Sequence, residues 1–335
     1  MAIEVSAPGR ICLFGEHQDF LGLSVIATPV SLDIKVKGTP RSDSIFAIHM
    51  PDLTGREPDY DEFDGTQELP YRHKRDYIRS ATNVLRRAGL KLTQGYDCEI
   101  HGTIPMNAGT SSSSALTIAW ASFLLSTQEG DVSRDPADIA MFGYWAEVRE
   151  FEEPGGMMDH YSSAVGGLLY IDCQQPVTVT HLGAKLEGFV IGDTLVPKNT
   201  TGVLRESRAA TNAGLATLTE SIPDFDFKTI PVEEATGFFP KMDKDVRRRI
   251  EANFVNRDLC QEARKMLSNG HLNPERLGEM LYGHQVQLRD GIGVSHPKLD
   301  QLIDAAMEAG ALGGKLNGSG CGGAMFAYAP GKQEE

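Results

Sequence analysis

The stretch PMNAGTSSSSA (Pro105–Ala115) places Gly109, Thr110 and four consecutive serines directly before an apolar run, Ala115–Leu125. The apolar run reads as a helix. Serine is favoured at the start of a helix and disfavoured in its interior, so the cluster offers hydroxyls and free backbone N–H groups. Together with the positive end of the helix dipole, these donors predict a binding site for a polyphosphate.

A serine-rich loop can also be no more than a flexible connector. Here a strand is predicted before it, over Asp97–Ile104, and a helix after it, which is the context that a phosphate-binding loop needs. The loop is not a Walker A sequence, because no Gly-Lys-Ser/Thr follows its glycine. Any lysine for the phosphates must therefore come from another part of the chain.

A second segment, KLNGSGCGGA (Lys315–Ala324), is rich in glycine. Glycines there could serve a tight hairpin or a bulge, since glycine adopts positive φ angles readily. So many in one apolar strand also indicate that another backbone or a ligand approaches closely. The glycines in and next to this segment are Gly314, Gly318, Gly320, Gly322 and Gly323.

A third segment, APGRICLFGEHQD (Ala7–Asp19), carries polar side chains in an otherwise apolar stretch. Arg10 is a fixed cation suited to a phosphate or a carboxylate. Glu16, His17 and Asp19 could be solvated loop side chains. Three hydrogen-bonding groups within four residues also suit the recognition of several adjacent hydroxyls.

The composition limits the classes of function. A chain of 335 residues is long enough for two domains, and its net charge of −14 argues against nucleic acid or an anionic membrane as a partner. The N-terminus lacks the pattern of a signal peptide, and no apolar stretch is long enough to span a bilayer. We therefore expect a soluble cytoplasmic protein. Its five scattered cysteines fit a reducing compartment: Cys12, Cys98, Cys173, Cys260 and Cys321.

The order of predicted elements indicates an α+β protein with two halves. Strands are expected mainly early in the chain and helices mainly later, and we place the domain boundary between residues 185 and 186. The expected strands are Ile3–Val5, Ile11–Phe14, Val25–Ile26, Leu32–Val36, Asp97–Ile104, Gly166–Asp172, Gly188–Gly192 and a last glycine-rich strand. Besides Ala115–Leu125, the expected helices are Tyr71–Ala88, Pro136–Phe151 with Asp135 as its cap, Thr201–Thr219, Lys244–Leu267, Leu277–Arg289 and Pro297–Ala309.

Taken together, the three segments resemble the hallmark motifs of the GHMP kinase family, in the family's order and across most of the chain. PGRICLFGEHQD is similar to the galactokinase signature PGRxNLxGEHxDY, with Cys12 and Phe20 in place of the usual Asn and Tyr. NAGTSSSSAL is similar to the phosphate loop GxGLSSSAAL. KLNGSGCGGA is similar to the third motif.

A fourth stretch, AEVREFEEPGGMMD (Ala146–Asp159), is similar to the galactokinase run AExxFxGxPCGxMDQ. The resemblance implies that Asp159 is the catalytic aspartate and that Glu147 holds Mg²⁺ together with Ser113. Without the resemblance, Glu147 could lie on a solvated helix face and Asp159 could cap a following helix. His160 stands where the galactokinase run has Gln.

The resemblance implies a two-domain fold and an ATP- and Mg²⁺-dependent sugar 1-kinase. The expected fold is a ribosomal protein S5 domain 2-like N-terminal domain over residues 1–185 and a ferredoxin-like C-terminal domain over residues 186–335. Arg10 would stabilise Asp159 and the transferring phosphoryl group. The expected acceptor-binding residues are Glu16, His17, Asp19, Gly155 and Gly156. The expected nucleotide-binding residues are Asn107, Gly109, Thr110, Ser111, Ser112, Ser113 and Ser114.

The later half of the chain departs from the galactokinase pattern. The segment Gly192–Asn212 has no tyrosine where galactokinases usually carry SxYNxRR, and Lys198 is closer to the mevalonate-kinase side of the family. The chain also stops at Glu335, where relatives usually add a helix. We therefore expect either that its C-terminal domain is shorter than in the relatives or that the sequence is a truncated one. A partner chain could cover the resulting sheet edge, which makes a homodimer possible.

Three functions stay open at this point. A sugar 1-kinase acting on galactose or a related monosaccharide accounts for the polar Gly-Glu-His-Gln-Asp run. A mevalonate-type kinase would need fewer polar side chains for its mostly apolar acceptor. A non-catalytic sensor that binds sugar and ATP would be expected to lack one of the catalytic groups, because a fold by itself does not fix the function.

Overall fold

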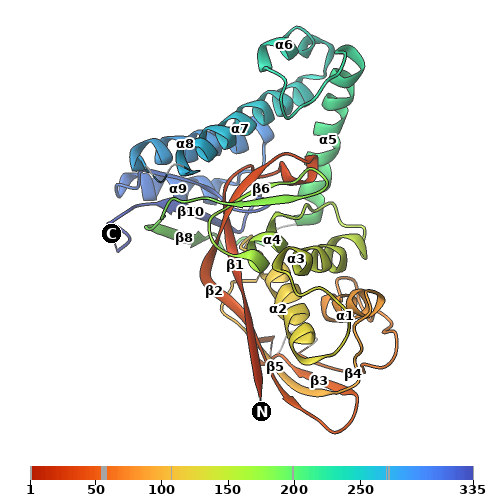
Figure 1. Ribbon diagram of the computed structural model, residues 1–335. Coiled ribbons are helices and arrows are strands. Elements are labelled where there is room, and N and C mark those ends of the chain that lie inside the picture. Colours follow the sequence, from red (N-terminus) through yellow and green to blue (C-terminus); the bar gives the residue numbers. More distant parts are fainter. Residues whose placement is uncertain are drawn as a thin grey trace. The chain divides into compact units, whose positions relative to one another are not determined.

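The computed structural model describes residues 2–53, 59–106, 108–197, 200–268, 270 and 272–334. The chain divides into two compact units. Unit 1 consists of the chain up to Arg10, Pro29–Met106 and Thr110–Gly167. Unit 2 consists of Ile11–Thr28, a short piece ending at Gly109, and the chain from Leu168 onward. The long strands β1 (Ile3–Phe14) and β2 (Val25–Pro40) contribute residues to both (Figure 1).

The units divide the chain differently from the predicted domains. The change from unit 1 to unit 2 at Gly167 and Leu168 comes before the boundary predicted between residues 185 and 186. Unit 2 also takes in Ile11–Thr28, which the sequence pattern did not indicate. The division into domains 1–185 and 186–335 stays a prediction.

Unit 1 combines a sheet with helices that carry the predicted phosphate loop. In the sheet, β3 is parallel to β5, while β3–β4 and β5–β2 are antiparallel pairs. Its strands besides β1 and β2 are β3 (Ile45–His49), β4 (Tyr60–Asp64) and β5 (Tyr96–Gly102). Its helices are η2 (Pro51–Leu53), α1 (Tyr77–Arg87), α2 (Ser112–Thr127), α3 (Pro136–Tyr144), the π-helix η3 (Trp145–Arg149) and α4 (Met158–Val165).

Helix α2 is the centre of the core of unit 1. Trp120 on α2 is fully buried and packs against aromatic rings of the sheet, among them Phe46 and Phe63. Its indole Nε1 donates a hydrogen bond of 2.9 Å to the Thr82 hydroxyl, so the one polar atom of the ring is satisfied. A Cβ at Gly38 on β2 would lie 2.2 Å from the Phe123 ring, so only glycine leaves room there.

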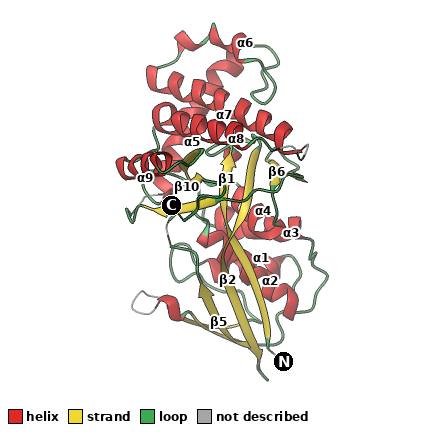
Figure 2. Ribbon diagram, turned by 90° about the vertical axis from the view of Figure 1, so that its left-hand side faces the viewer, coloured by secondary structure: helices red, strands yellow, loops and turns green. Residues whose placement is uncertain are grey.

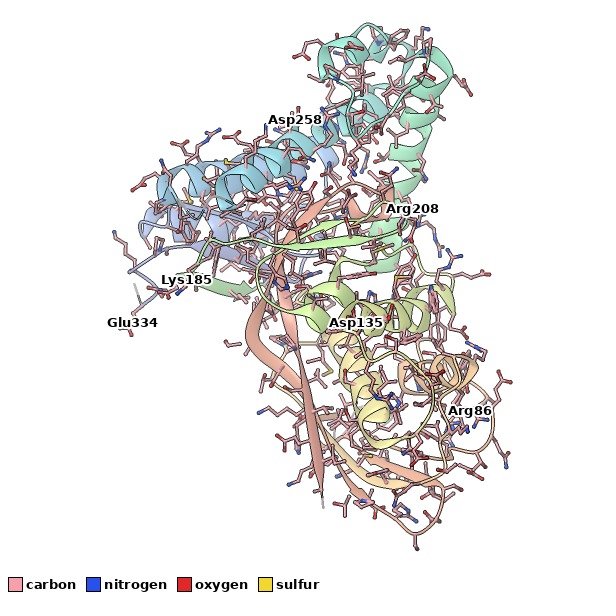
Figure 3. All side chains as sticks on the ribbon, viewed as in Figure 1. Arg86, Asp135, Lys185, Arg208, Asp258 and Glu334 are labelled. Atoms are coloured by element: carbon pink, nitrogen blue, oxygen red, sulfur yellow. The ribbon has the colours of Figure 1, made fainter. Side chains whose placement is uncertain are left out.

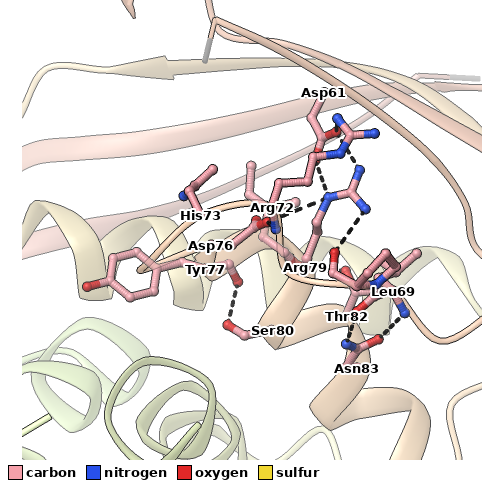
Figure 4. A network of polar contacts seen from close by, with 12 residues as sticks. Asp61, Leu69, Arg72, His73, Asp76, Tyr77, Arg79, Ser80, Thr82 and Asn83 are labelled. Carbon is pink, nitrogen blue, oxygen red and sulfur yellow. Dashed lines mark hydrogen bonds and ion pairs between the residues drawn. The ribbon is translucent and has the colours of Figure 1, made fainter. Parts of the chain in front are cut away.

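A buried ion network ties β4 to α1 (Figure 4). Arg79 donates to both carboxylate oxygens of Asp61 at 2.9 and 2.7 Å, and Arg72 also binds this carboxylate. Arg79 stacks over Phe63 at 5.3 Å, which covers the guanidinium with an apolar surface. On the other side of α1, the Ser80 hydroxyl donates to the Ala146 carbonyl at 2.8 Å and thereby holds the π-helix η3.

Two of the predicted strand breaks are wrong. Ile3–Phe14 is one strand that runs through Pro8 and Gly9. The Pro8 carbonyl accepts a hydrogen bond from the Ser163 hydroxyl. A Cβ at Gly9 would lie 2.6 Å from the Thr110 carbonyl oxygen, so glycine lets the Thr110 backbone approach the strand there. Strand β2 likewise continues through Pro29, which lies between the stretch paired with β6 (Leu169–Asp172) and the stretch paired with β5. A proline without an N–H is tolerated where no ladder bond is required.

The predicted helices mostly form, with changed ends. Helix α1 begins at Tyr77 instead of Tyr71, because the Asp76 carboxylate accepts the Arg72 N–H at 3.0 Å and Arg75 adopts a left-handed φ of 66°. The predicted helix Pro136–Phe151 is α3 followed by the π-helix η3. Its predicted cap is confirmed: the side chain of Asp135, labelled in Figure 3, accepts the Ala137 N–H at 2.9 Å.

Unit 2 contains the later helices and a small antiparallel sheet in the order β8-β10-β9. The strands of unit 2 are β8 (Phe189–Asp193), β9 (Gly313–Leu316) and β10 (Ala324–Tyr328) in this sheet, together with β6 and β7 (Thr178–His181), which pair with each other outside it. Its helices are η1 (Asp19–Leu21), α5 (Thr200–Ser221), α6 (Val232–Thr236), η4 (Phe239–Lys241), α7 (Lys244–Ser268), α8 (Pro274–Val286), the π-helix η5 (Gln287–Ile292) and α9 (Pro297–Glu308).

The sheet of unit 2 packs against its helices. Helices α7 and α8 lie side by side (Figures 1 and 2), α8 contacts β9, and α9 contacts both β9 and β10. Buried Leu316, Met325 and Leu299 belong to this core, and α5 packs separately on α7 around Ile250 and Phe254. The glycine-rich segment Lys315–Ala324 begins in β9 and ends at the start of β10, so the predicted single glycine-rich strand is two antiparallel strands joined by a turn at one end of this sheet.

The Asp61 network gives a first prediction. Replacing Asp61 with Asn removes the closest counter-charge of the buried Arg79 guanidinium and leaves it only the longer 3.7 Å contact with Asp76, so we expect the free energy of unfolding of unit 1 to fall by about 3 kcal/mol. Urea denaturation followed by the fluorescence of buried Trp120 measures it. The matched control is Asp97→Asn, which removes an exposed partner of Arg41 and should change little. Equal effects of Asp61→Asn and Asp97→Asn on the free energy of unfolding would contradict a stabilising role of the buried Asp61 network.

Candidate active site

Arg10 and Asp159 form an ion pair inside unit 1. The Nε and one terminal nitrogen of Arg10 both lie 2.7 Å from the same carboxylate oxygen, Oδ1 of Asp159. The Arg10 side chain is 4% exposed, whereas that of Asp159 is 30% exposed. Both of these bonds go to Oδ1 of Asp159. The other oxygen of this partly exposed carboxylate, Oδ2, takes no part in these two bonds. The two residues that the sequence predicted to be catalytic are therefore in contact.

The environment keeps Asp159 ionised. Burial is the largest single effect and raises the pKa of this carboxyl, but the charges of Arg10 and His160 and the hydrogen bonds of Ser111 and Arg10 together outweigh it. The pKa of Asp159 is therefore below its ordinary value. Asp159 also lies in the first turn of α4, where the helix dipole favours a negative charge. The alternative that Asp159 caps this helix is wrong, because the cap position is Met157.

The predicted phosphate loop leads into helix α2. Ser111 precedes the helix with a left-handed φ of 63°, and the helix itself begins at Ser112. As at any helix start, the first N–H groups have no partner within the helix. The Thr110 and Ser111 hydroxyls are buried, and in the described part of the chain neither makes a well-formed hydrogen bond. Buried hydroxyls and N–H groups at the positive end of a helix fit an anion.

Glu147 is carried by the π-helix η3 and faces His160 on α4. His160 Nε2 lies 2.9 Å from Glu147 Oε2, and the Glu147 side chain is 13% exposed. Burial raises the pKa of Glu147, but the hydrogen bond and charge of His160, with smaller contributions from Ser113 and Ser114, bring it below its ordinary value. An ionised carboxylate beside serine hydroxyls is the hard-oxygen donor set that Mg²⁺ prefers.

Glu16 lies in unit 2 and is bonded through both carboxylate oxygens. Oε2 is 2.7 Å from Lys315 Nζ, and Oε1 accepts the Gly318 N–H at 2.9 Å. Lys315 is fully buried and also donates to the Cys12 carbonyl at 2.8 Å. A carboxylate oxygen can accept more than one bond, so the role of Glu16 toward an acceptor stays a prediction.

The glycine-rich segment comes close to the start of the phosphate loop within unit 2. Asn317 Nδ2 donates to the Gly109 carbonyl at 2.9 Å. Gly318 has a φ of 77°, and a Cβ there would lie 2.8 Å from the same Gly109 oxygen. The prediction that these glycines permit a close approach of another backbone is confirmed at Gly318.

The remaining predicted residues are distributed over both units. In unit 2, His17 has a φ of 63° and lies 3.1 Å from the Ser319 carbonyl through Nε2, while Asp19 begins η1 and accepts the Phe20 N–H at 2.9 Å. In unit 1, Gly155 and Gly156 lie between η3 and α4. Asn107 and Lys198 lie outside the described residues. Their roles stay predictions.

Two functional partners were missed by the sequence analysis. Lys315 was part of a quoted motif without a role, and His160 was noted only as a departure from Gln. The signal for Lys315 was a lysine within an apolar, glycine-rich strand, since such a buried cation requires a buried acid. The signal for His160 was its place directly after Asp159 in a stretch that also contains Glu147.

Comparisons with known proteins agree with this arrangement. Models of the GHMP kinases N terminal domain and the GHMP kinases C terminal domain match residues 76–167 and 263–335, and a galactokinase galactose-binding signature matches residues 2–40. A Haemophilus influenzae galactokinase is 30% identical over 98% of this chain and 85% of the relative. A Pasteurella multocida galactokinase matches at the same level, and a Pyrococcus furiosus mevalonate kinase is 29% identical over 100% of this chain and 91% of the relative.

Solved structures show the same fold. The Lactococcus lactis galactokinase complexed with galactose has a TM-score of 0.85 at 22% identity, over 99% of this chain and 86% of that one. The Methanococcus jannaschii mevalonate kinase has a TM-score of 0.71 at 18% identity, over 100% of this chain and 93% of that one. The protein belongs to the GHMP kinase family and has its two-domain fold of mixed α and β structure. Within the family it is a galactokinase-like sugar kinase, a phosphotransferase with an alcohol acceptor. Within the described residues, no helix has the length and apolar character needed to cross a bilayer.

The buried pair of Glu16 and Lys315 gives a second prediction. Each single substitution, Glu16→Gln or Lys315→Met, leaves a buried charge or polar group without its partner and should lower the free energy of unfolding by about 3–5 kcal/mol. The double variant should lose clearly less than the sum of the two. Urea denaturation of the four proteins measures this coupling. Arg276→Met, which breaks an exposed pair with Glu262, serves as control and should have little effect. Additive single effects would show that the two groups are not coupled.

Proposed function

We propose that the protein transfers the γ-phosphoryl group of ATP to the anomeric hydroxyl of a monosaccharide, galactose or a close relative. The galactose-binding signature over residues 2–40 and the galactokinase relatives support this choice of acceptor. The observation that supports the chemistry most directly is the contact of Arg10 with a single oxygen of the partly exposed Asp159. Phosphoryl transfer needs little covalent chemistry from the protein and depends on positioning and charge neutralisation.

Asp159 would bind the reacting hydroxyl through the oxygen that Arg10 does not engage. Its lowered pKa makes it a weak base before the reaction begins. We therefore infer that it orients the hydroxyl first and takes the proton late, when the acceptor oxygen has already begun to bond to phosphorus. Arg10 would limit the charge that builds up between the carboxylate and the transferring group.

The start of helix α2 would hold the polyphosphate. Thr110, the serines Ser111, Ser112, Ser113 and Ser114, and the free N–H groups would bind the β- and γ-phosphates of ATP, with Gly109 before them. This arrangement suits a chain that is acidic overall, because the donors are local dipoles and need no positive surface.

Glu147 and Ser113 would hold the Mg²⁺ of the nucleotide. In the described residues, no three His, Cys, Asp or Glu side chains gather into a metal site. A cation that takes one carboxylate and one hydroxyl from the protein and the rest from phosphate and water fits this donor set. When bound, Mg²⁺ neutralises charge on the phosphate oxygens.

Glu16, His17 and Asp19 in unit 2, and Gly155 and Gly156 in unit 1, are the residues predicted for the other hydroxyls of the acceptor. A mevalonate-type acceptor is the second candidate, because a mevalonate kinase is 29% identical over the whole chain. A coupled assay of ADP release with free sugars and with mevalonate separates the two. Turnover with mevalonate alone would overturn the sugar assignment, and saturable ATP binding without turnover would favour a sensor.

Replacing Asp159 with Asn gives a third prediction. Asn keeps the shape but cannot take the proton or carry the charge, so we expect kcat with the best sugar to fall by at least about 10²-fold. The KM for ATP should change little, since the phosphates are held elsewhere. Asp138→Asn, on the exposed start of α3, is the matched control and should keep full activity. An Asp159→Asn variant with turnover near that of the native protein would overturn the assignment.

The lowered carboxyl pKa values give a fourth prediction. The pKa values of Asp159 and Glu147 are both lowered from the ordinary values of their side chains, so both groups stay ionised as the pH falls from 8 to about 5. Their protonation should therefore produce no acid limb in kcat/KM over that window. The profile is measured for the native protein and for His160→Gln, which removes the neighbouring imidazole. An acid limb near pH 6 that persists in His160→Gln would contradict the lowered values.

A further inference from the structure

The proposed function gives no role to His160, although its side chain contacts a residue of the candidate site. It lies in the first turn of α4, directly after Asp159, and its side chain is 2% exposed. Its Nε2 makes the 2.9 Å contact with Oε2 of Glu147. A single helical turn thus contains one residue bound to Arg10 and the next bound to Glu147.

The surroundings fix the His160 ring. Tyr144 meets it edge-on, with ring centroids 5.9 Å apart at 80°. A Cβ at Gly143 would lie 3.2 Å from its Cδ2 and 2.6 Å from the Ile118 Cδ1, so this part of α3 leaves the ring just enough room. These contacts with Gly143 and Tyr144 of α3 restrict the position of the His160 ring.

The hydrogen bond to Glu147 determines which ring nitrogen of His160 carries a proton. A carboxylate only accepts hydrogen bonds, so Nε2 must be the N–H donor to Glu147. Nδ1 is buried, and the described residues provide it with no partner. Burying a nitrogen without a partner costs free energy. The contact of Nε2 with Glu147 is therefore the polar interaction that accounts for a histidine at this buried position.

Glu147 itself is held from two sides. Its π-helix is wider than an α-helix and depends on outside contacts for its shape. The Ser80 hydroxyl on α1 holds the backbone at Ala146, and His160 holds the carboxylate. With Oε2 engaged, Oε1 is the oxygen outside the bond to His160.

We propose that His160 is a positioning residue that holds Oε2 of Glu147, so that Oε1 is presented to the Mg²⁺ of the bound nucleotide. The inference rests on the proposed function, which assigns Glu147 as a metal ligand. It explains how a histidine can stand where the galactokinase run has glutamine, since both side chains donate an N–H. Asn is too short to make the same contact from this helix.

The test measures metal-dependent nucleotide binding without catalysis. ADP affinity is determined by titration calorimetry with Mg²⁺ and with EDTA, for the full-length native protein and its variants. We expect His160→Leu to weaken ADP binding at least tenfold in Mg²⁺ and to leave binding in EDTA within twofold. His160→Gln should restore the Mg²⁺ value to within threefold, and His160→Asn should not. Electron paramagnetic resonance measures the binding of Mn²⁺ to the ADP complex. In His160→Leu and His160→Asn, Mn²⁺ binding should weaken together with ADP binding in Mg²⁺.

Controls separate this inference from the function on which it rests. His101→Leu removes an exposed histidine that contacts Glu99 in the same unit, and it should change neither affinity. Glu147→Gln should lose the Mg²⁺ dependence; if it does not, the metal site is wrong and the inference falls with it. If Glu147→Gln loses it and His160→Leu does not, only the inference is overturned. Equal weakening in Mg²⁺ and in EDTA would assign His160 a purely structural role. Should His160→Leu fail to fold, the contrast between the Gln and Asn variants decides.

Discussion

Arg10 is bonded at both ends, and the site in unit 1 depends on those two contacts. Its backbone N–H donates to the Thr110 carbonyl at 3.2 Å, and its guanidinium binds Asp159. One residue of β1 is thereby connected to the entrance of α2 and to the first turn of α4. Thr110 and Asp159, which follow Arg10 by 100 and 149 positions in the sequence, are both fixed by this one residue.

The buried cations among these residues are paired with carboxylates before any ligand binds. The buried cations Arg10 and Lys315 each face a carboxylate, Asp159 and Glu16, in their own unit. Burial of a lone charge is costly, so such pairs are required wherever a buried cation is kept. For a polyphosphate this leaves mainly dipoles, hydroxyls and the cation that travels with the nucleotide. Local donors of this kind bind an anion even though the chain carries a net charge of −14.

Local patterns predicted the helices better than the strands. The cap at Asp135 and the helix that follows the serines depend on neighbouring residues, so they could be predicted from the sequence. Strand β3 pairs with β4 and with the distant β5, and no local signal specifies such pairing. The contact of Glu16 with Lys315 joins residues 299 positions apart. The motifs indicated that both segments matter, but only the fold determines which side chains meet. The π-helices η3 and η5 were missed because each continues directly from an α-helix, so the predictions Pro136–Phe151 and Leu277–Arg289 did not separate the two kinds of helix.

The π-helix η3 has a consequence for how this site can vary. A π-turn contains one more residue than an α-turn, and one residue corresponds to about 100° of rotation around the helix axis. The direction of the Glu147 carboxylate is therefore set by the number of residues after Tyr144 as much as by the glutamate itself. A deletion of one residue there would keep every functional side chain and still turn this carboxylate away from His160. The number of residues in this segment therefore matters for the site as much as which residues they are.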